Sequence, residues 1–274
     1  MSTAPLLIVR RRFGETARRD AWWVQPLVVF LGLSTFVVYS TWAAFQGTNE
    51  KAMMMGDTVI FEDEVNPVMS AALDSGLTVT ALHNHFFFDR PKVYFMHIEG
   101  EGAVDKLAGA VRKVYDAAKQ IRAANPQPKD SFGAARLPEK NSITAAPLNE
   151  IFGAQGELKD GMVKFTFGRP ATMHGVKIDN TMGANTWAAF AGSDDDAVVD
   201  GDFAVTEDEL QPTARSLLKE RINIVAIHQH MTHEQPRMMF FHYWGRGRAK
   251  DLAQAIKGAF LVAGLQEIAS PIHN

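Results

Sequence analysis

Six histidines in two parts of the chain have the spacing of metal ligands. They form two equivalent sets: His83, His85 and His97 in one, and His228, His230 and His242 in the other. Residues two apart on a strand point to the same face, so the His-x-His pair of each set projects together. Three neutral imidazoles suit zinc, copper, nickel or iron and leave a position for water or substrate. The pattern therefore predicts a divalent transition-metal site in each set.

The residues between the histidines predict a β-hairpin. Segments 77–88 and 92–100 are apolar, β-branched and aromatic, and Asp-Arg-Pro at 89–91 separates them. With a turn centred there, His97 returns close to opposite His83, and cross-strand partners on one face lie about 5 Å apart. The alternative is that the histidines only donate hydrogen bonds to carbonyls or carboxylates within the sheet.

Acidic residues supply the second candidate group. Glu64 and Glu209 each end a run of three acids that precedes a helical pattern. Acids at the start of a helix are stabilised by its dipole and by free backbone N–H groups, which favours a structural role. The functional alternative makes each glutamate a fourth metal ligand or a general base acting on metal-bound water. Asp57 and Asp202 follow glycines in apolar segments, and either orient a histidine through its second ring nitrogen or close a bulge.

An internal repeat explains why the candidate residues occur twice. The segment Thr-Trp-Ala-Ala-Phe begins at Thr41 and again at Thr186, and this offset of 145 residues also superposes the histidine sets. Apolar alternation, a helix with acids at its start and glycine at its end, a hairpin and an amphipathic helix follow in order. Each copy is thus expected to form strand, strand, helix, strand, strand, helix. Sequential strands flanked by helices predict an α+β fold with a mostly antiparallel sheet.

The amino terminus predicts one transmembrane helix ahead of the repeats. Residues 1–20 carry five arginines against two acids and form a basic cytoplasmic tail, and residues 21–40 carry no charge. Such a segment is long enough to span a bilayer as a helix. The arginine bias predicts a single-pass protein of the cell membrane with a cytoplasmic amino terminus and extracytoplasmic repeats. A cleaved signal peptide is the alternative.

The remaining chain divides into a first repeat at 41–124, a linker at 125–146 and a second repeat at 147–267. The linker is polar and proline-bearing and shows no periodicity. The second repeat has a lead-in with a short helix and at least one strand, for which the first repeat has no counterpart. The first repeat is therefore truncated at its front, or the chain joins two unrelated segments.

Composition excludes several classes of function. Apolar residues make up 46% of the 274 and charged residues 22%, which is typical of a packed globular protein. The net charge of −3 and the lack of a basic cluster beyond residue 20 argue against a nucleic-acid partner. The chain has no cysteine, which excludes disulfides, thiolate metal sites and a cysteine nucleophile. No G-x-S-x-G elbow or P-loop is present, and no organic cofactor is indicated.

Residues 56–85, followed by 91–102, resemble the LppY/LpqO family of bacterial lipoproteins. The likeness covers 41–124 and 148–264. The resemblance implies a duplicated, exported domain of unknown function and supplies no reaction. The chain departs from the family in lacking a lipid-carrying cysteine and the front of the first copy.

Three functions are compatible with these patterns. In the first, a membrane-anchored extracytoplasmic domain binds a divalent transition metal as a sensor or scavenger. In the second, the same sites serve a metal-dependent hydrolase or oxygenase-type enzyme. In the third, the repeats form a metal-free surface binding or assembly module. The ligand-like spacing favours the first, with the membrane and a metal ion or small molecule as partners, because no catalytic acid–base pair is visible.

Overall fold

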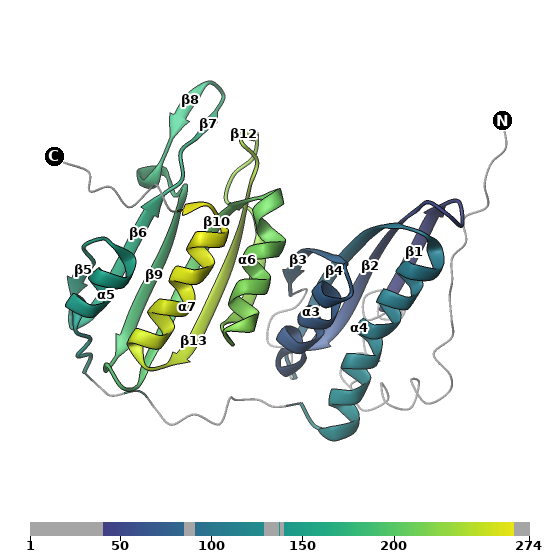
Figure 1. The fold of residues 1–274 in the computed structure, drawn as a ribbon, viewed down its shortest axis with the longest axis horizontal. Helices are drawn as coiled ribbons and strands as arrows, with labels where there is room; N and C mark the ends of the chain where they lie inside the picture. The colour runs from purple at the N-terminus through teal and green to yellow at the C-terminus, as the bar shows by residue number, and fades with distance from the viewer. Residues whose placement is uncertain (1–40, 85–90, 129–136, 138–139, 266–274) are drawn as a thin grey trace, which may run out of the picture. The chain divides into compact units, whose positions relative to one another are not determined.

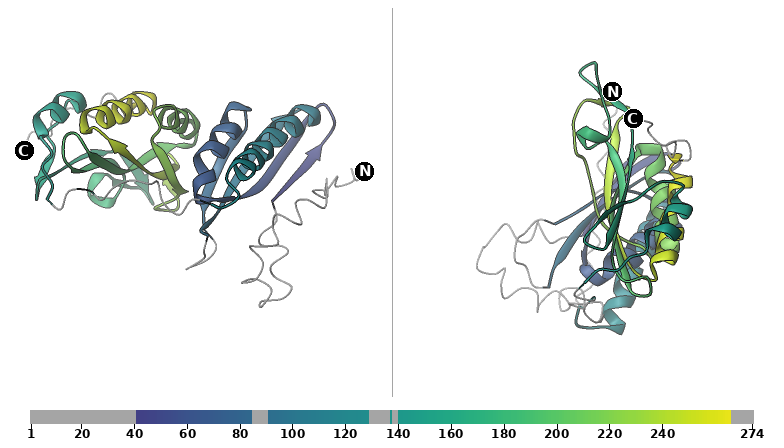
Figure 2. Two further views of the ribbon diagram at one scale, coloured as in Figure 1. Left: turned by 90° about the horizontal axis from the view of Figure 1, so that it is seen from below. Right: turned by 90° about the vertical axis from the view of Figure 1, so that its left-hand side faces the viewer.

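The chain consists of two compact units, each with helices packed on an antiparallel sheet. The computed structural model describes residues 41–84, 91–128, 137 and 140–265. The units comprise Met1–Pro128 and Lys129–Asn274 (Figure 1). In each unit the helices lie on one face of the sheet, as Figure 2 shows. This two-layer arrangement buries the apolar face of the sheet and leaves the other face for polar side chains.

The first unit contains a four-stranded sheet in the order β1-β2-β4-β3. Its elements are β1 (Trp42–Gly47), β2 (Ala52–Phe61), η3 (Glu62–Glu64), α3 (Val65–Asp74), β3 (Thr78–His83), β4 (Val93–Gly102) and α4 (Val104–Ala124). Helix α4 buries Leu107, Val111 and Val114, which recur at helical spacing. This apolar stripe is what holds an otherwise polar helix against the sheet.

The second unit contains a six-stranded sheet in the order β11-β13-β10-β9-β6-β5 and a small sheet in the order β12-β7-β8. Its first elements are α5 (Ala145–Phe152), β5 (Glu157–Lys159), β6 (Met162–Gly168), β7 (Ala171–Met173), β8 (Val176–Ile178) and η4 (Asn180–Met182). The elements that follow are β9 (Asn185–Gly192), β10 (Ala197–Thr206), α6 (Glu207–Lys219), β11 (Asn223–His228), β12 (Glu234–Gln235), β13 (Met238–Gly247) and α7 (Ala249–Val262). From β9 onwards this order repeats that of the first unit, with β12 added.

The core of the second unit lies between its sheet and its helices and is strongly aromatic. The ring of Phe260 on α7 is 5.5 Å from that of Phe152 on α5 and 5.2 Å from that of Phe203 on β10. Phe203 in turn stacks on Phe241 of β13 at 5.2 Å. Aromatic pairs at such distances add to the stabilisation from burial. Because successive strand residues alternate in direction, Asp202 beside Phe203 points away from the helices.

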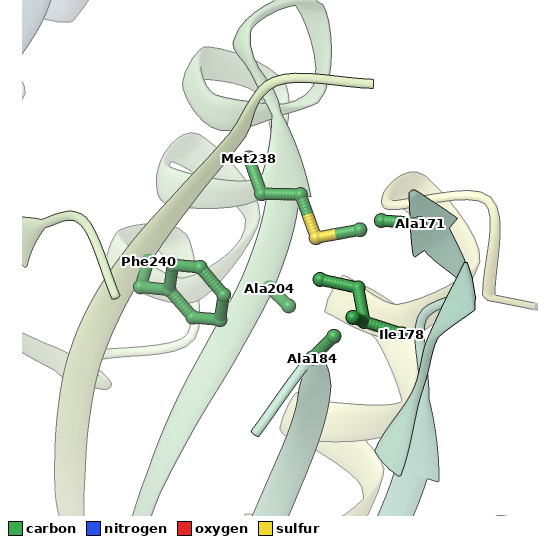
Figure 3. Close-up of a cluster of buried hydrophobic side chains, with 6 residues drawn as sticks. All are labelled: Ala171, Ile178, Ala184, Ala204, Met238 and Phe240. Atoms are coloured by element: carbon green, nitrogen blue, oxygen red, sulfur yellow. The ribbon is translucent and has the colours of Figure 1, made fainter. Parts of the chain in front are cut away.

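The small sheet packs on the helix-free face of β10 and β13. Ala171 and Ile178 from β7 and β8 contact Ala204, Met238 and Phe240 in one buried cluster (Figure 3). Burial of these apolar side chains attaches the β7–β8 hairpin to the main sheet. The face of the sheet that carries the polar residues is therefore partly covered in the second unit.

The fold class expected from the sequence is wrong as stated. It assumed two six-element copies behind a transmembrane helix, whereas the second unit has a six-stranded sheet, a separate three-stranded sheet and three helices. The lead-in of the second repeat, predicted to hold a short helix and at least one strand, forms α5 and the four strands β5 to β8. The predicted helix at 21–40 lies outside the described residues. Of the helices that the structure describes, none is both long and apolar enough to cross a membrane.

Candidate metal centre

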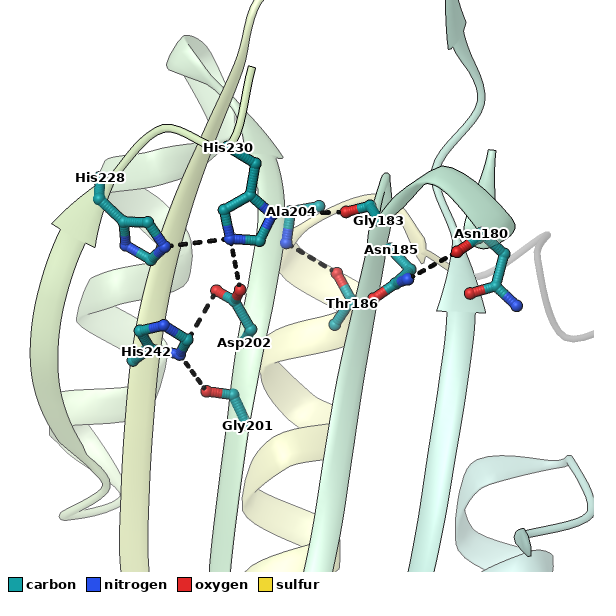
Figure 4. Close-up of polar contacts among 10 residues, drawn as sticks. All are labelled: Asn180, Gly183, Asn185, Thr186, Gly201, Asp202, Ala204, His228, His230 and His242. Atoms are coloured by element: carbon teal, nitrogen blue, oxygen red, sulfur yellow. Dashed lines mark hydrogen bonds and ion pairs between the residues drawn. The ribbon is translucent and has the colours of Figure 1, made fainter. Parts of the chain in front are cut away.

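Four polar side chains of the second unit gather on the face of the sheet that points away from the helices (Figure 4). Asp202 comes from β10, His242 from β13 and His228 from the end of β11, and His230 follows β11. These four residues are called the central cluster below. The structure thus brings together the three histidines that the sequence predicted and adds an aspartate.

The strand ladders explain why these side chains meet. Asp202 is the direct partner of His242 across β10 and β13. Directly opposite residues of an antiparallel pair share a face. His228 is opposite Phe240, two residues from His242 along β13, so it projects from the same face.

The polar atoms converge on a small volume. The Nε2 atoms of His228 and His230 lie 3.1 Å apart, and His230 Nε2 lies 3.1 Å from Asp202 Oδ2. The His242 ring stacks on that of His228, with centroids 4.7 Å apart and planes at 21°. One ligand atom from each of Asp202, His228 and His230 lies within 4.8 Å of the others. The fourth member is adjacent, since His242 Nδ1 is 4.0 Å from Asp202 Oδ1.

Backbone carbonyls hold the second nitrogen of two imidazoles. His230 Nδ1 lies 3.4 Å from the Gly183 oxygen, and His242 Nδ1 lies 3.3 Å from the Gly201 oxygen. A carbonyl oxygen can only accept, so each Nδ1–H donates and a neutral ring keeps an unprotonated Nε2. Contacts of this kind orient metal-bound histidines and fix their tautomer.

Phe240 supports His230, the one histidine of the central cluster that lies outside a strand. The ring of His230 stacks on that of Phe240, with centroids 3.7 Å apart and planes at 14°. Phe240 is fully buried and belongs to the cluster beneath the β7–β8 hairpin. The packing of that hairpin therefore fixes the Phe240 ring, and through it the position of His230.

Burial shifts the pKa values of two members of the central cluster, Asp202 and His228. Asp202 is 1% exposed, and its Oδ1 has no hydrogen-bond partner among the described residues. Burial raises the pKa of Asp202, while the nearby His242 and His230 lower it. Burial lowers the pKa of His228 to about 4, and His242 and His230 contribute to this shift. His228 is therefore neutral near pH 7, which is the form in which an imidazole binds a metal ion.

Asp202, His228 and His230 offer one carboxylate and two imidazoles to a cation, and the His242 imidazole lies adjacent. Two nitrogens bound to one tetrahedral zinc ion at about 2.0–2.1 Å lie about 3.3 Å apart. The 3.1 Å between the Nε2 atoms of His228 and His230 is close to this value. With Asp202 as the third ligand, a tetrahedral ion keeps one position, which either His242 or a water molecule can take.

The first unit repeats part of this arrangement. The Nε2 atoms of His83 and His97 lie 3.0 Å apart, and their ring centroids are 5.0 Å apart. His83 Nδ1 lies 3.4 Å from the carbonyl oxygen of Asn84, so its Nδ1 also faces a backbone acceptor. Asp57 is the direct strand partner of His97, in the position equivalent to that of Asp202. His85, the third predicted histidine, lies outside the described residues.

The register of the first hairpin differs from the expected one. His83 is opposite Phe95, and His97 is opposite Ala81, two residues away from the expected pairing; a bulge after Val79 shifts the β3–β4 register by one residue. The two imidazoles still meet, since diagonal neighbours on adjacent strands are within reach of long side chains. A bulge at the equivalent place in β11 has the same effect in the second unit.

Asp202 has a more central position than its sequence pattern predicts. The pattern predicts an aspartate that orients a histidine or closes a bulge, whereas the carboxylate lies among the imidazole nitrogens. The signal was present, because the Gly-Asp pair is shared by both repeats at the same offset as the histidines. The Gly183 carbonyl gave no such signal, since the position 145 residues earlier, Val38, lies ahead of the first repeat.

The two predicted glutamates lie at helix starts and contact arginines. Arg122 donates to both carboxylate oxygens of Glu64, at 2.7 and 2.8 Å, and a backbone N–H donates to Oε2 at 2.9 Å. Glu209 Oε2 accepts from a backbone N–H at 2.9 Å and from Arg169. Neither glutamate belongs to the group of ligand atoms found among the described residues. A role as ligand or base stays a prediction, and these contacts favour the structural role.

Replacing Glu209 with alanine should destabilise the second unit and leave metal binding intact. The change removes the cap of α6 and leaves the buried guanidinium of Arg169 without its carboxylate, at a cost of about 2 kcal/mol. Thermal unfolding and metal content measure the two effects. Glu207→Ala, in the same acidic run but exposed, is the matched control and should change neither. Loss of metal at an unchanged melting temperature would assign Glu209 to the centre instead.

Comparison with known proteins gives a family and no function. A family model described as "Domain of Unknown Function (DUF1259)" matches residues 28–117 and 146–262. The two matched stretches agree with a duplicated domain, and the resemblance to the LppY/LpqO lipoproteins stays a prediction. Neither the curated proteins nor the solved structures gave a match. Since the matched stretches cover well over half of its length, the chain belongs to this DUF1259 family of domains of unknown function.

Proposed function

We propose that the second unit binds a divalent transition metal ion through Asp202, His228 and His230, with His242 as an adjacent fourth donor. The observation that carries the proposal is the convergence of a buried carboxylate and two Nε2 atoms at separations of 3.1 Å. Metal binding, as a sensor or scavenger would use it, is the function this geometry supports best.

The electrostatics of the convergence call for a positive charge. The Gly183 carbonyl accepts a hydrogen bond from the Nδ1–H of His230. In the neutral form of the ring, Nε2 then carries a lone pair that points at the Asp202 carboxylate and at His228. Electron-rich atoms this close repel one another unless a cation or a proton lies between them. A metal ion satisfies all of them at once, whereas a single proton satisfies one pair.

The donor types restrict the metal. Imidazole suits zinc, copper, nickel and iron, whereas calcium and magnesium take oxygen ligands. The chain has no cysteine to add a thiolate, so the ligands come from histidine and carboxylate alone. Zinc, copper, nickel and ferrous iron are therefore the candidates, and their order of affinity follows the general series for divalent ions.

The number of protein ligands distinguishes a site that only binds metal from a site that can catalyse a reaction. If His242 completes the set, the ion is enclosed and the centre stores or senses metal. If His242 only stacks on His228, a water molecule takes the last position, and such a water can be activated. The stacked ring and the contact of His242 Nδ1 with the Gly201 carbonyl hold the imidazole beside the ion in either case.

The test is metal analysis of the whole purified protein. After dialysis against zinc and removal of excess ion, His228→Ala combined with His230→Ala should lose one equivalent of metal relative to the unchanged chain. His83→Ala combined with His97→Ala is the matched pair, and reports on the first unit separately. Equal metal content in the unchanged protein and the His228/His230 variant, or protein that stays metal-free after dialysis, would end the proposal. Circular dichroism verifies that each variant is folded.

A further inference from the structure

A second pair of histidines lies outside the central cluster and outside the repeated positions. His174 follows β7 at the turn of the β7–β8 hairpin, and His233 immediately precedes β12. Both side chains are exposed, and the first repeat has no histidine at either equivalent position. They are called the outer histidine pair below. Their rings lie 5.7 Å apart between centroids, with planes at 48°.

The end of the β7–β12 ladder brings the outer histidine pair together. Glu234 pairs with Met173, and Gln235 pairs with Thr172. His233 and His174 are the next residues on the two segments, directly beyond the pair of Glu234 with Met173. Paired residues of an antiparallel ladder have Cβ atoms about 4.5–5.5 Å apart, so this pairing keeps the two chain segments close where the histidines lie.

The backbone that carries the outer histidine pair is anchored on both sides. Met173 and Met231 pack against the buried cluster of Figure 3. Glu234, which is buried, accepts a hydrogen bond from the Met238 N–H at 2.9 Å. Two imidazoles held in this way lose less conformational freedom on binding an ion than two independent surface histidines do.

Both histidines lie just beyond the ladder and have a left-handed backbone conformation, with φ of 51° at His174 and 67° at His233. This conformation is uncommon outside glycine, although histidine, asparagine and aspartate tolerate it better than other residues do. The tolerance of histidine for positive φ explains the presence of a histidine at either turn alone. It does not explain why two separate turns both carry a histidine and bring the two side chains together.

We propose that His174 and His233 form a second, solvent-exposed site for a divalent transition metal such as zinc, nickel or copper. Two imidazoles bound to one ion at about 2.0–2.1 Å place their centroids about 5–6 Å apart, which includes the observed 5.7 Å. Water completes the coordination, because both side chains are exposed. The proposal does not depend on an ion in the central cluster.

Such an ion would cross-link the β7–β8 hairpin to the segment between β11 and β12. That segment also carries His230, whose Nδ1 contacts Gly183 just after η4. The outer ion thus joins the β7–β8 hairpin, whose Ala171 and Ile178 pack in one cluster with Phe240, to the segment that carries His230. Occupancy of the outer site is expected to hold the hairpin and this segment together and to slow exchange of an ion in the centre.

The experiment titrates Zn²⁺ into the whole protein by calorimetry at neutral pH. His174→Ala, His233→Ala and the double variant should each lose the same single binding event, because one ion needs both rings. Lys177→Ala, an exposed change on the same hairpin, is the control and should keep the event. Hydrogen exchange at 171–178 should slow on zinc addition in the unchanged protein and not in the three histidine variants.

Two outcomes would overturn the outer site. If each single variant loses only part of the signal and the double variant loses the sum, the histidines bind zinc independently. If all three variants titrate like the unchanged protein, the outer histidine pair binds no ion. The Asp202→Ala, His228→Ala double variant separates this proposal from that for the centre, since it should retain the outer event.

Discussion

Asp202→Ala should weaken metal binding by the second unit by at least about 100-fold, since even outer-shell contacts of a metal site contribute 10–100-fold. The carboxylate is the only anionic member of the central cluster and lies 3.1 Å from His230 Nε2. Without it, only imidazoles remain in the cluster, and the ion loses both a ligand and charge compensation. Competition with a chromophoric chelator measures the change in affinity.

Two further variants separate a ligand from a structural aspartate. Asp200→Asn alters the next carboxylate along the same face of β10 and should leave the affinity unchanged. Asp202→Asn keeps the side-chain volume and removes the charge, so it should lose the metal. It should not lower the melting temperature of the metal-free protein, because burial already disfavours the Asp202 carboxylate. Unchanged metal affinity in Asp202→Ala would show that the ion binds elsewhere in the protein.

Gly201→Ala should destabilise the second unit by about 3 kcal/mol, the upper part of the usual range for overpacking. A Cβ at this position would overlap the Tyr243 hydroxyl and the carbonyl oxygen of Trp187. These two groups are hydrogen-bonded to each other at 3.0 Å, so neither can move without loss. For a domain of this size the melting temperature should fall by roughly 6–12 °C, measured by thermal unfolding.

The first unit supplies a matched control for this substitution. Gly56 is the equivalent glycine, and a Cβ there would lie 2.8 Å from the Trp42 oxygen and 3.3 Å from an Ile98 side-chain carbon. Gly56→Ala should therefore cost less than Gly201→Ala. Adding Tyr243→Ile to Gly201→Ala introduces the residue type of the equivalent position, Ile98, removes the hydroxyl that the Cβ would overlap, and should recover part of the loss. A Gly201→Ala protein that melts like the unchanged chain would refute the packing argument.

The repeat and the hairpin patterns located the histidines, but not the whole fold. Apolar alternation and helix-end residues are local signals, so β10, β11, β13 and α6 could be anticipated from the second repeat alone. The small sheet could not, because β7, β8 and β12 are only two or three residues long and gain their stability from packing on β10 and β13. Strands that short carry no periodicity.

The candidate site was predictable where it depends on side-chain spacing and unpredictable where it depends on register. The spacing of His228 and His230 indicated ligands, but the bulge in β11 that sets their final direction has no distinct residue pattern. The stack of His230 on Phe240 depends on the hairpin that buries Phe240, which is a tertiary effect. The position of Asp202 in the site follows as soon as its pairing with His242 across β10 and β13 is known.

The arginines that neutralise the two capping glutamates come from different places in the two units. Arg122 reaches Glu64 from α4, near the carboxyl end of the first unit, whereas Arg169 reaches Glu209 from just after β6. The duplicated segments are therefore not interchangeable modules. A recombinant piece of the second unit that started at β9, to match the first unit in length, would lack Arg169 and leave Glu209 without its counter-ion. A stable piece of the second unit therefore has to begin upstream of Arg169.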